Sequence, residues 1–148
     1  MSIPANLLVL VADGRKAIIL RNGNDEKFPN LKTEWVAIGE NPTTAAQGAD
    51  RPGRVHSQDR RSSVDQTDWH DEAEAAFAKR TAAALEELVR DDQKCRLVIV
   101  APPKVLSILR RSLRDETMQR VIAELPRDLV NLPVGDIETH LGRAMAHS

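Results

Sequence analysis

Residues 7–21 read LLVLVADGRKAIILR, two apolar runs on either side of a short polar turn. The first run, Leu7 to Ala12, is apolar at every position, so both faces of a strand formed there must be covered. Asp13-Gly14 is typical of a hairpin turn in which glycine adopts a positive φ. Lys16 to Arg21 then returns antiparallel. The stretch therefore predicts a hairpin whose first strand lies at the centre of a sheet.

Three further strands follow along the chain. Thr33 to Ile38 is less uniformly apolar, which favours a place near an edge. Arg96 to Ala101 is a second run that is apolar on both faces, and Arg120 to Leu125 predicts a short fifth strand. Because the first and fourth strands are the most apolar, we expect them to be adjacent and parallel at the centre. The helix between them then makes the right-handed crossover.

Three helices are predicted between and after these strands. The first runs from about Thr67 to Asp92 and begins with acidic residues, which suit the positive end of the helix dipole. The second follows Pro103 and covers Lys104 to Arg114, and the third runs from Pro133 to about Met145. The element order predicts an α/β fold with a single ribonuclease H-like domain over residues 1–148. Its mixed five-stranded sheet has the order 3-2-1-4-5, with three helices on its two faces.

The composition narrows the class of protein. The chain is 41% hydrophobic and 29% charged with a formal net charge of -1, which fits a soluble globular protein and excludes a wholly basic nucleic-acid coat. One cysteine, Cys95, excludes a disulfide framework and a multi-cysteine zinc site. The run Leu7 to Ala12 is too short for a signal peptide or a membrane span, so we expect a cytoplasmic protein without a membrane partner.

The predicted topology also suggests a test for nuclease chemistry. Ribonuclease H-like nucleases hold two metal ions with carboxylates in the first strand and near the end of the fourth. Here Leu7 to Ala12 contains no acid, Asp13 has a conformational role in the turn, and the fourth strand ends in Ala101-Pro102-Pro103. We therefore expect no metal site and no cofactor. The sequence leaves catalysis open but favours a binding protein.

The segment from about residue 39 to 64 shows no periodicity, and long irregular segments of this kind usually carry function. Residues 50–63 contain four arginines against two aspartates. Such a loop can contact phosphates. The candidate binding residues are Arg51, Gly53, Arg54, His56, Ser57, Gln58, Arg60 and Arg61. The alternative is a solvated loop whose arginines pair with the acidic start of the long helix.

Several short motifs, taken in their order and spacing, resemble a known family. They are Val11-Ala12-Asp13-Gly14-Arg15-Lys16, Pro52-Gly53-Arg54, Phe77-Ala78, Leu97-Val98-Ile99-Val100-Ala101-Pro102-Pro103, Arg127-Asp128-Leu129 and Pro133-Val134 with Ile137-Glu138. The chain resembles the bacterial host attachment proteins, described as required for attachment to host cells. That family in turn is similar to the middle domain of archaeal and eukaryotic peptide-chain release factors, which has a ribonuclease H-like fold.

The resemblance implies a role for the loop. In the release factors, the loop between the third strand and the long helix carries a Gly-Gly-Gln tripeptide that promotes release of the nascent chain at the ribosome. The loop here lies in the matching place and is comparably basic, but it lacks that tripeptide; Gly53-Arg54 and Gln58 are the nearest residues. The resemblance to the release-factor loop therefore extends to its position in the chain and its positive charge, but not to the tripeptide.

Three functions follow as hypotheses. The first is a cytoplasmic protein that contacts the ribosome or RNA through the basic loop. The second is a protein-interaction module that supports host attachment or biofilm formation indirectly. The third is a hydrolase or rescue factor acting on a peptidyl-tRNA-type ester, with His56, Ser57 or Gln58 positioning water. An exposed edge strand would allow a homodimer, although nothing in the sequence demands one.

Overall fold

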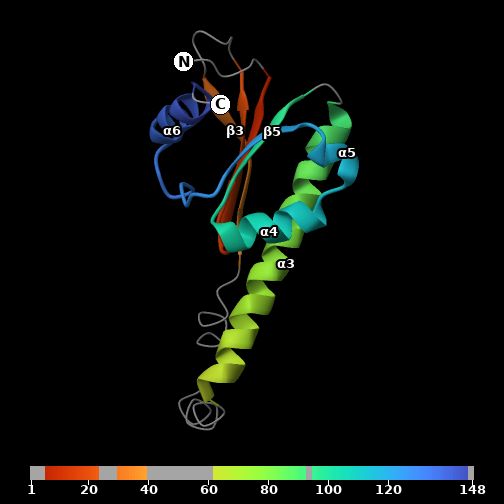
Figure 1. The fold of residues 1–148 in the computed structure, drawn as a ribbon, viewed down its shortest axis with the longest axis vertical. Coiled ribbons are helices and arrows are strands. Elements are labelled where there is room, and N and C mark those ends of the chain that lie inside the picture. Colours follow the sequence, from red (N-terminus) through yellow and green to blue (C-terminus); the bar gives the residue numbers. More distant parts are fainter. Residues whose placement is uncertain (1–5, 24–29, 40–61, 93–94, 147–148) are drawn as a thin grey trace.

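The computed structural model describes residues 6–23, 30–39, 62–92 and 95–146. These form one five-stranded sheet with helices against both faces (Figure 1). The strands are β1 (Leu8–Ala12), β2 (Lys16–Asn22), β3 (Leu31–Ile38), β4 (Leu97–Val100) and β5 (Val121–Leu125). The helices are α3 (Ser62–Asp91), α4 (Pro103–Ser112), α5 (Asp115–Met118) and α6 (Val134–Ala146).

The sheet order β3-β2-β1-β4-β5 confirms the predicted topology, which is consistent with a ribonuclease H-like fold. β1 pairs antiparallel with β2 and parallel with β4, with Leu10 opposite both Ile19 and Ile99. β3 is an edge strand, as its weaker apolarity predicted. Between Ile19 and Leu20 of β2 the pairing shifts, so that Glu34 of β3 is an extra residue in the ladder.

Two cores explain why β1 is apolar at every position. Leu8, Leu10 and Ala12 belong to the core beneath α3 and α4. Val9 and Val11 belong to the core on the other face, beneath α6. Successive strand residues point to opposite faces, so a strand covered on both sides cannot accept a polar residue at either position.

Helix α3 is longer than the strands that it covers. It begins at Ser62, five residues before the predicted Thr67, and its Glu74 meets the β1–β2 turn at Gly14. The N-terminal part of α3 extends past the sheet (Figure 1). At 1.5 Å per residue, residues 62–73 make up roughly 18 Å of the helix. The chain thus carries its longest helix partly outside its core.

The structure corrects two details of the prediction. The described residues contain four helices where three were expected, because α5 is a single short turn with no room for a helical repeat. The Asp13-Gly14 turn does not use a positive φ, since no described glycine adopts one. Instead the Asp13 carboxylate accepts the backbone N–H groups of Arg15 and Lys16, at 2.8 and 2.7 Å. A β-carbon on Gly14 would lie 2.7 Å from the Glu74 side chain, so any larger residue there requires that side chain to move.

In the part of the chain that is described, no helix is both long enough and apolar enough to cross a membrane.

Candidate functional site

The parallel strands β1 and β4 terminate at the same end of the sheet. We call this end the carboxyl edge, as distinct from the edge strand β3. Open α/β sheets commonly bind ligands in the crevice beyond this edge. The antiparallel pairing brings Ile38, the last residue of β3, opposite Lys16 at the same edge. The β1–β2 turn, the exit of β3, the start of α4 and the middle of α3 therefore meet here. We take this edge as the candidate functional site.

The exit of β3 is anchored tightly at this edge. The Gly39 N–H donates to the Arg15 carbonyl at 2.6 Å. A β-carbon on Gly39 would lie 2.9 Å from the ring of Phe77, a side chain only 2% exposed. Glycine therefore lets the chain pass between the β1–β2 turn and α3 at the point where the segment 40–61 begins.

An ion-pair cluster links α3 to the start of α4 beside this anchor. The Lys104 ammonium lies 2.5 Å from an Asp71 carboxylate oxygen and 3.6 Å from one of Glu74. The hydrogen bond to Asp71, with the added charge of Glu74, raises the pKa of Lys104 above its ordinary value. The Lys104 ammonium is thus the cation that balances the charge of the Asp71 and Glu74 carboxylates. The sequence indicates the acids at the start of the long helix, but not the position of Lys104 among them.

The arrangement of acids bears on metal chemistry. The Asp13 carboxylate is engaged by the two backbone N–H groups of its own turn. Asp71 and Glu74 face Lys104. Among the described residues, no three or more His, Cys, Asp or Glu side chains are grouped so that they could hold a metal ion.

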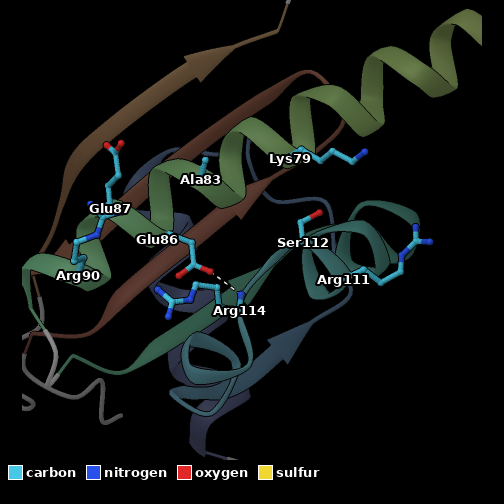
Figure 2. A pocket seen from close by; sticks show the side chains of 8 residues that line it. All are labelled: Lys79, Ala83, Glu86, Glu87, Arg90, Arg111, Ser112 and Arg114. Carbon is cyan, nitrogen blue, oxygen red and sulfur yellow. Dashed lines mark hydrogen bonds between the residues drawn. The ribbon is translucent and has the colours of Figure 1, made fainter.

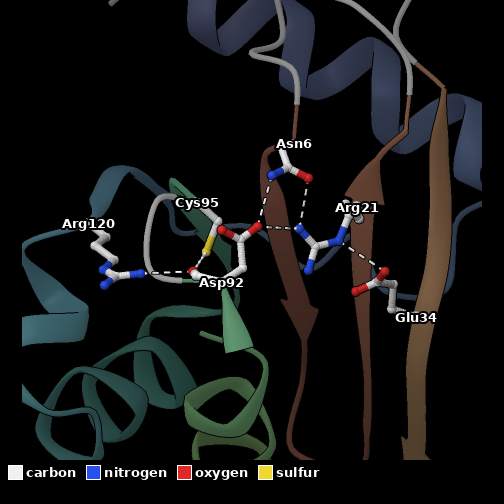
Figure 3. A network of polar contacts seen from close by, with 6 residues as sticks. All are labelled: Asn6, Arg21, Glu34, Asp92, Cys95 and Arg120. Carbon is white, nitrogen blue, oxygen red and sulfur yellow. Dashed lines mark hydrogen bonds and ion pairs between the residues drawn. The ribbon is translucent and has the colours of Figure 1, made fainter. Parts of the chain in front are cut away.

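A network of polar side chains lies at the opposite end of the strands, where it holds parts of the fold together (Figure 3). The Arg21 guanidinium donates to Glu34 at 2.9 Å and to Asp92 at 3.1 Å, and Asn6 donates to Asp92 at 2.8 Å. Burial would lower the pKa of Arg21, but Glu34 and Asp92 raise it above its ordinary value. These groups satisfy one another and fasten the end of α3 to β2 and β3.

Cys95 lies beside this network and is buried, with its thiol donating to the Asp92 carbonyl at 3.1 Å. Burial, followed by the charge of Asp92, raises the pKa of the Cys95 thiol. A thiol of this kind is a poor nucleophile, because the thiolate is the reactive form.

The family model for bacterial archaeo-eukaryotic release factor family 12 matches residues 6–141. The chain belongs to this release factor family. The relationship to release factors expected from the sequence is thereby confirmed, whereas the host attachment role stays a prediction. The match extends over the whole sheet and includes the segment between β3 and α3.

No curated protein matches this family 12 chain. A solved structure, the ethanolamine utilization protein EutJ from Carboxydothermus hydrogenoformans, is similar with a TM-score of 0.45 at 12% sequence identity. That likeness covers 84% of this chain and 46% of the EutJ chain, so this protein spans less than half of it.

All eight candidate binding residues of this release factor family member lie outside the described residues. They are Arg51, Gly53, Arg54, His56, Ser57, Gln58, Arg60 and Arg61. Their two flanks are described: Gly39 at the carboxyl edge and Ser62 at the outer end of α3. The structure thus shows where the segment is attached, and the roles of the eight residues stay predictions.

Proposed function

We propose that this protein is a cytoplasmic, translation-related factor that binds the ribosome or RNA through the basic segment around residues 51–61. The observation that carries the proposal is membership of a release factor family over residues 6–141. In the resembling release factors, the functional loop joins the third strand to the long helix. The segment 40–61 occupies this same place in the chain, between β3 and α3.

The attachment of the segment supports such a role. Gly39, the described residue before the segment, donates to the Arg15 carbonyl and lies against the Phe77 ring, so the chain is anchored where the segment begins. The other end joins a helix that projects beyond the sheet (Figure 1). Four arginines in the segment supply positive charge for phosphate contacts. A basic segment that joins the outer end of a projecting helix suits binding to a large, phosphate-rich partner.

Ribosome co-sedimentation at low and high salt tests the proposal. The test variant replaces Arg51, Arg54, Arg60 and Arg61 with glutamine. A charge-matched control replaces Lys32, Arg96, Arg127 and Arg143, all of which are exposed on the described surface. We expect the test variant to lose association and the control to keep it. If the wild-type protein does not sediment with ribosomes at low salt, or the two variants behave alike, the proposal is wrong.

Release activity is the second candidate, and family membership is the observation that favours it. His56, Ser57 and Gln58 are the polar residues of the segment that would position water against a peptidyl-tRNA ester. The assay is release of a labelled peptide from ribosome-bound tRNA. Release by the wild-type protein that is lost in a variant with all three residues replaced by alanine would establish the activity. Binding without release would leave the protein a binding factor.

A further inference from the structure

An open groove lies between α3 and the end of α4 (Figure 2). Its volume is about 520 Å³. Eight residues line it: Lys79, Ala83, Glu86, Glu87, Arg90, Arg111, Ser112 and Arg114. Ala83 on α3 and Ser112 on α4 are small, so the space between the two helices is left unfilled.

The charges around the groove are unevenly distributed. Four cations and two carboxylates line it, although the whole chain has a net charge of -1. Glu86 is directed inward and accepts the Arg114 backbone N–H at 2.6 Å, so its carboxylate is occupied within the fold. Figure 2 shows the Glu87 side chain extending away from Arg114. With four cations against two carboxylates, the residues that line the groove carry a net positive charge.

Neighbouring arginines on α4 have different roles. Arg110 makes a bidentate contact with Glu124 of β5, at 2.8 and 3.0 Å to one carboxylate oxygen and 3.1 Å to the other. These hydrogen bonds raise the pKa of Arg110 and fasten α4 to the sheet. Arg111 and Arg114 instead line the groove, where Arg114 makes a longer contact of 3.4 Å with the exposed Glu116. The three arginines thus separate into one structural residue and two at the groove.

We propose that this groove is a second RNA contact, which binds the phosphate backbone independently of the segment 40–61. This inference rests on the proposed function to the extent that both involve RNA. Three of the four cations are arginines, whose planar donors match phosphate oxygens in pairs. Lys79 and Arg90 are eleven positions apart on α3, so the cations span roughly 16 Å of groove, enough for several phosphates.

The lining also sets the kind of recognition. None of the eight residues is aromatic, so the groove offers no platform on which bases could stack. Binding is therefore expected to depend on the backbone and on salt, with little preference for sequence. For four contacts to single-stranded RNA, log affinity should fall with log salt at a slope of about -2.8.

The test measures binding of a labelled oligouridylate by fluorescence anisotropy over a range of salt concentrations. The groove variant is Arg111→Gln/Arg114→Gln, in which the Arg114 backbone N–H can still donate to Glu86. The control is Arg110→Gln on the same helix, which removes one positive charge outside the groove. The loop variant, with Arg51, Arg54, Arg60 and Arg61 replaced by glutamine, is measured in parallel. Thermal unfolding of every variant checks that the fold is kept.

We expect the groove variant to bind about 25-fold more weakly near 0.1 M salt and to lose about 1.4 from the magnitude of the salt slope, because two contacts are removed. Arg110→Gln should bind as the wild-type protein does. The inference is overturned if the groove variant keeps wild-type affinity and slope, if the wild-type protein binds no RNA, or if an acidic peptide displaces the RNA at equal charge concentration. Loss of RNA binding in the groove variant but not in the loop variant would support the groove and contradict the proposed loop function.

Discussion

Glu86 fastens the connection between α4 and α5 to the long helix, and its removal is expected to destabilise the protein. One carboxylate oxygen accepts the Arg114 backbone N–H at 2.6 Å, and the other accepts the Thr117 hydroxyl. Thr117 is 3% exposed, so water cannot replace the missing acceptor. Arg114 is exposed, so its N–H can turn to solvent.

The magnitude follows from these two environments. In Glu86→Ala, the orphaned Thr117 hydroxyl costs about 1–3 kcal/mol. Loss of the hydrogen bond to the exposed Arg114 N–H lowers the stability by about 0.5–1 kcal/mol more. The better helix propensity of alanine offsets this loss by about a few tenths of a kcal/mol. A central estimate is about 2.5 kcal/mol, which corresponds to a fall in Tm of about 5–10 °C for a chain of this size.

Urea unfolding monitored by circular dichroism measures the change. Glu87→Ala is the matched control, because Glu87 is the exposed neighbour on the same helix, and we expect a change within about 0.5 kcal/mol. Thr117→Val removes the buried donor, so adding Glu86→Ala to that variant should cost clearly less than Glu86→Ala alone. The reasoning fails if Glu86→Ala is as stable as Glu87→Ala, or if the two substitutions are additive.

Three further predictions concern the glycines, the cysteine and the loop. Gly39→Ala should lower the free energy of unfolding in urea by about 1–3 kcal/mol, because its methyl group would press against the buried Phe77 ring. Gly14→Ala should lower it by less, because the Glu74 side chain that it meets can move aside. A larger loss for Gly14→Ala than for Gly39→Ala would contradict this. Because the pKa of Cys95 is raised, the native state holds the thiol proton more tightly than the unfolded chain does, in which the thiol pKa is about 8.5. The contribution of this thiol to the free energy of unfolding is therefore complete below that pH and is lost as the pH rises above it. Between about pH 8 and pH 10 the urea midpoint should therefore fall more steeply in the wild-type protein than in Cys95→Ala, and parallel slopes would refute this. Replacing residues 50–61 with a short Gly/Ser bridge should leave the Tm nearly unchanged, because Val55 is the main large apolar residue removed, while abolishing ribosome association; a large fall in Tm would show that the segment is structural.

Burial periodicity explains what could be predicted from the sequence. A strand covered on both faces must be apolar at consecutive positions, so the runs Leu7 to Ala12 and Leu97 to Ala101 are enough to indicate the two central strands. With the helix between them, these runs determine a parallel central pair and hence the sheet order. The short helix α5 could not be predicted in this way, because four residues are too few to show a helical period.

Contacts between distant residues were decided by the tertiary structure. Lys104 and Asp71 are 33 positions apart, and only the packing of α4 on α3 brings the ammonium to the carboxylate. The same packing separates Arg110, which is held by Glu124, from Arg111 and Arg114 at the groove. Local periodicity determines which face of an element is buried, because burial acts on each element separately. Which charged side chains then meet on the surface depends on how the elements cross, and that is a property of the assembled fold.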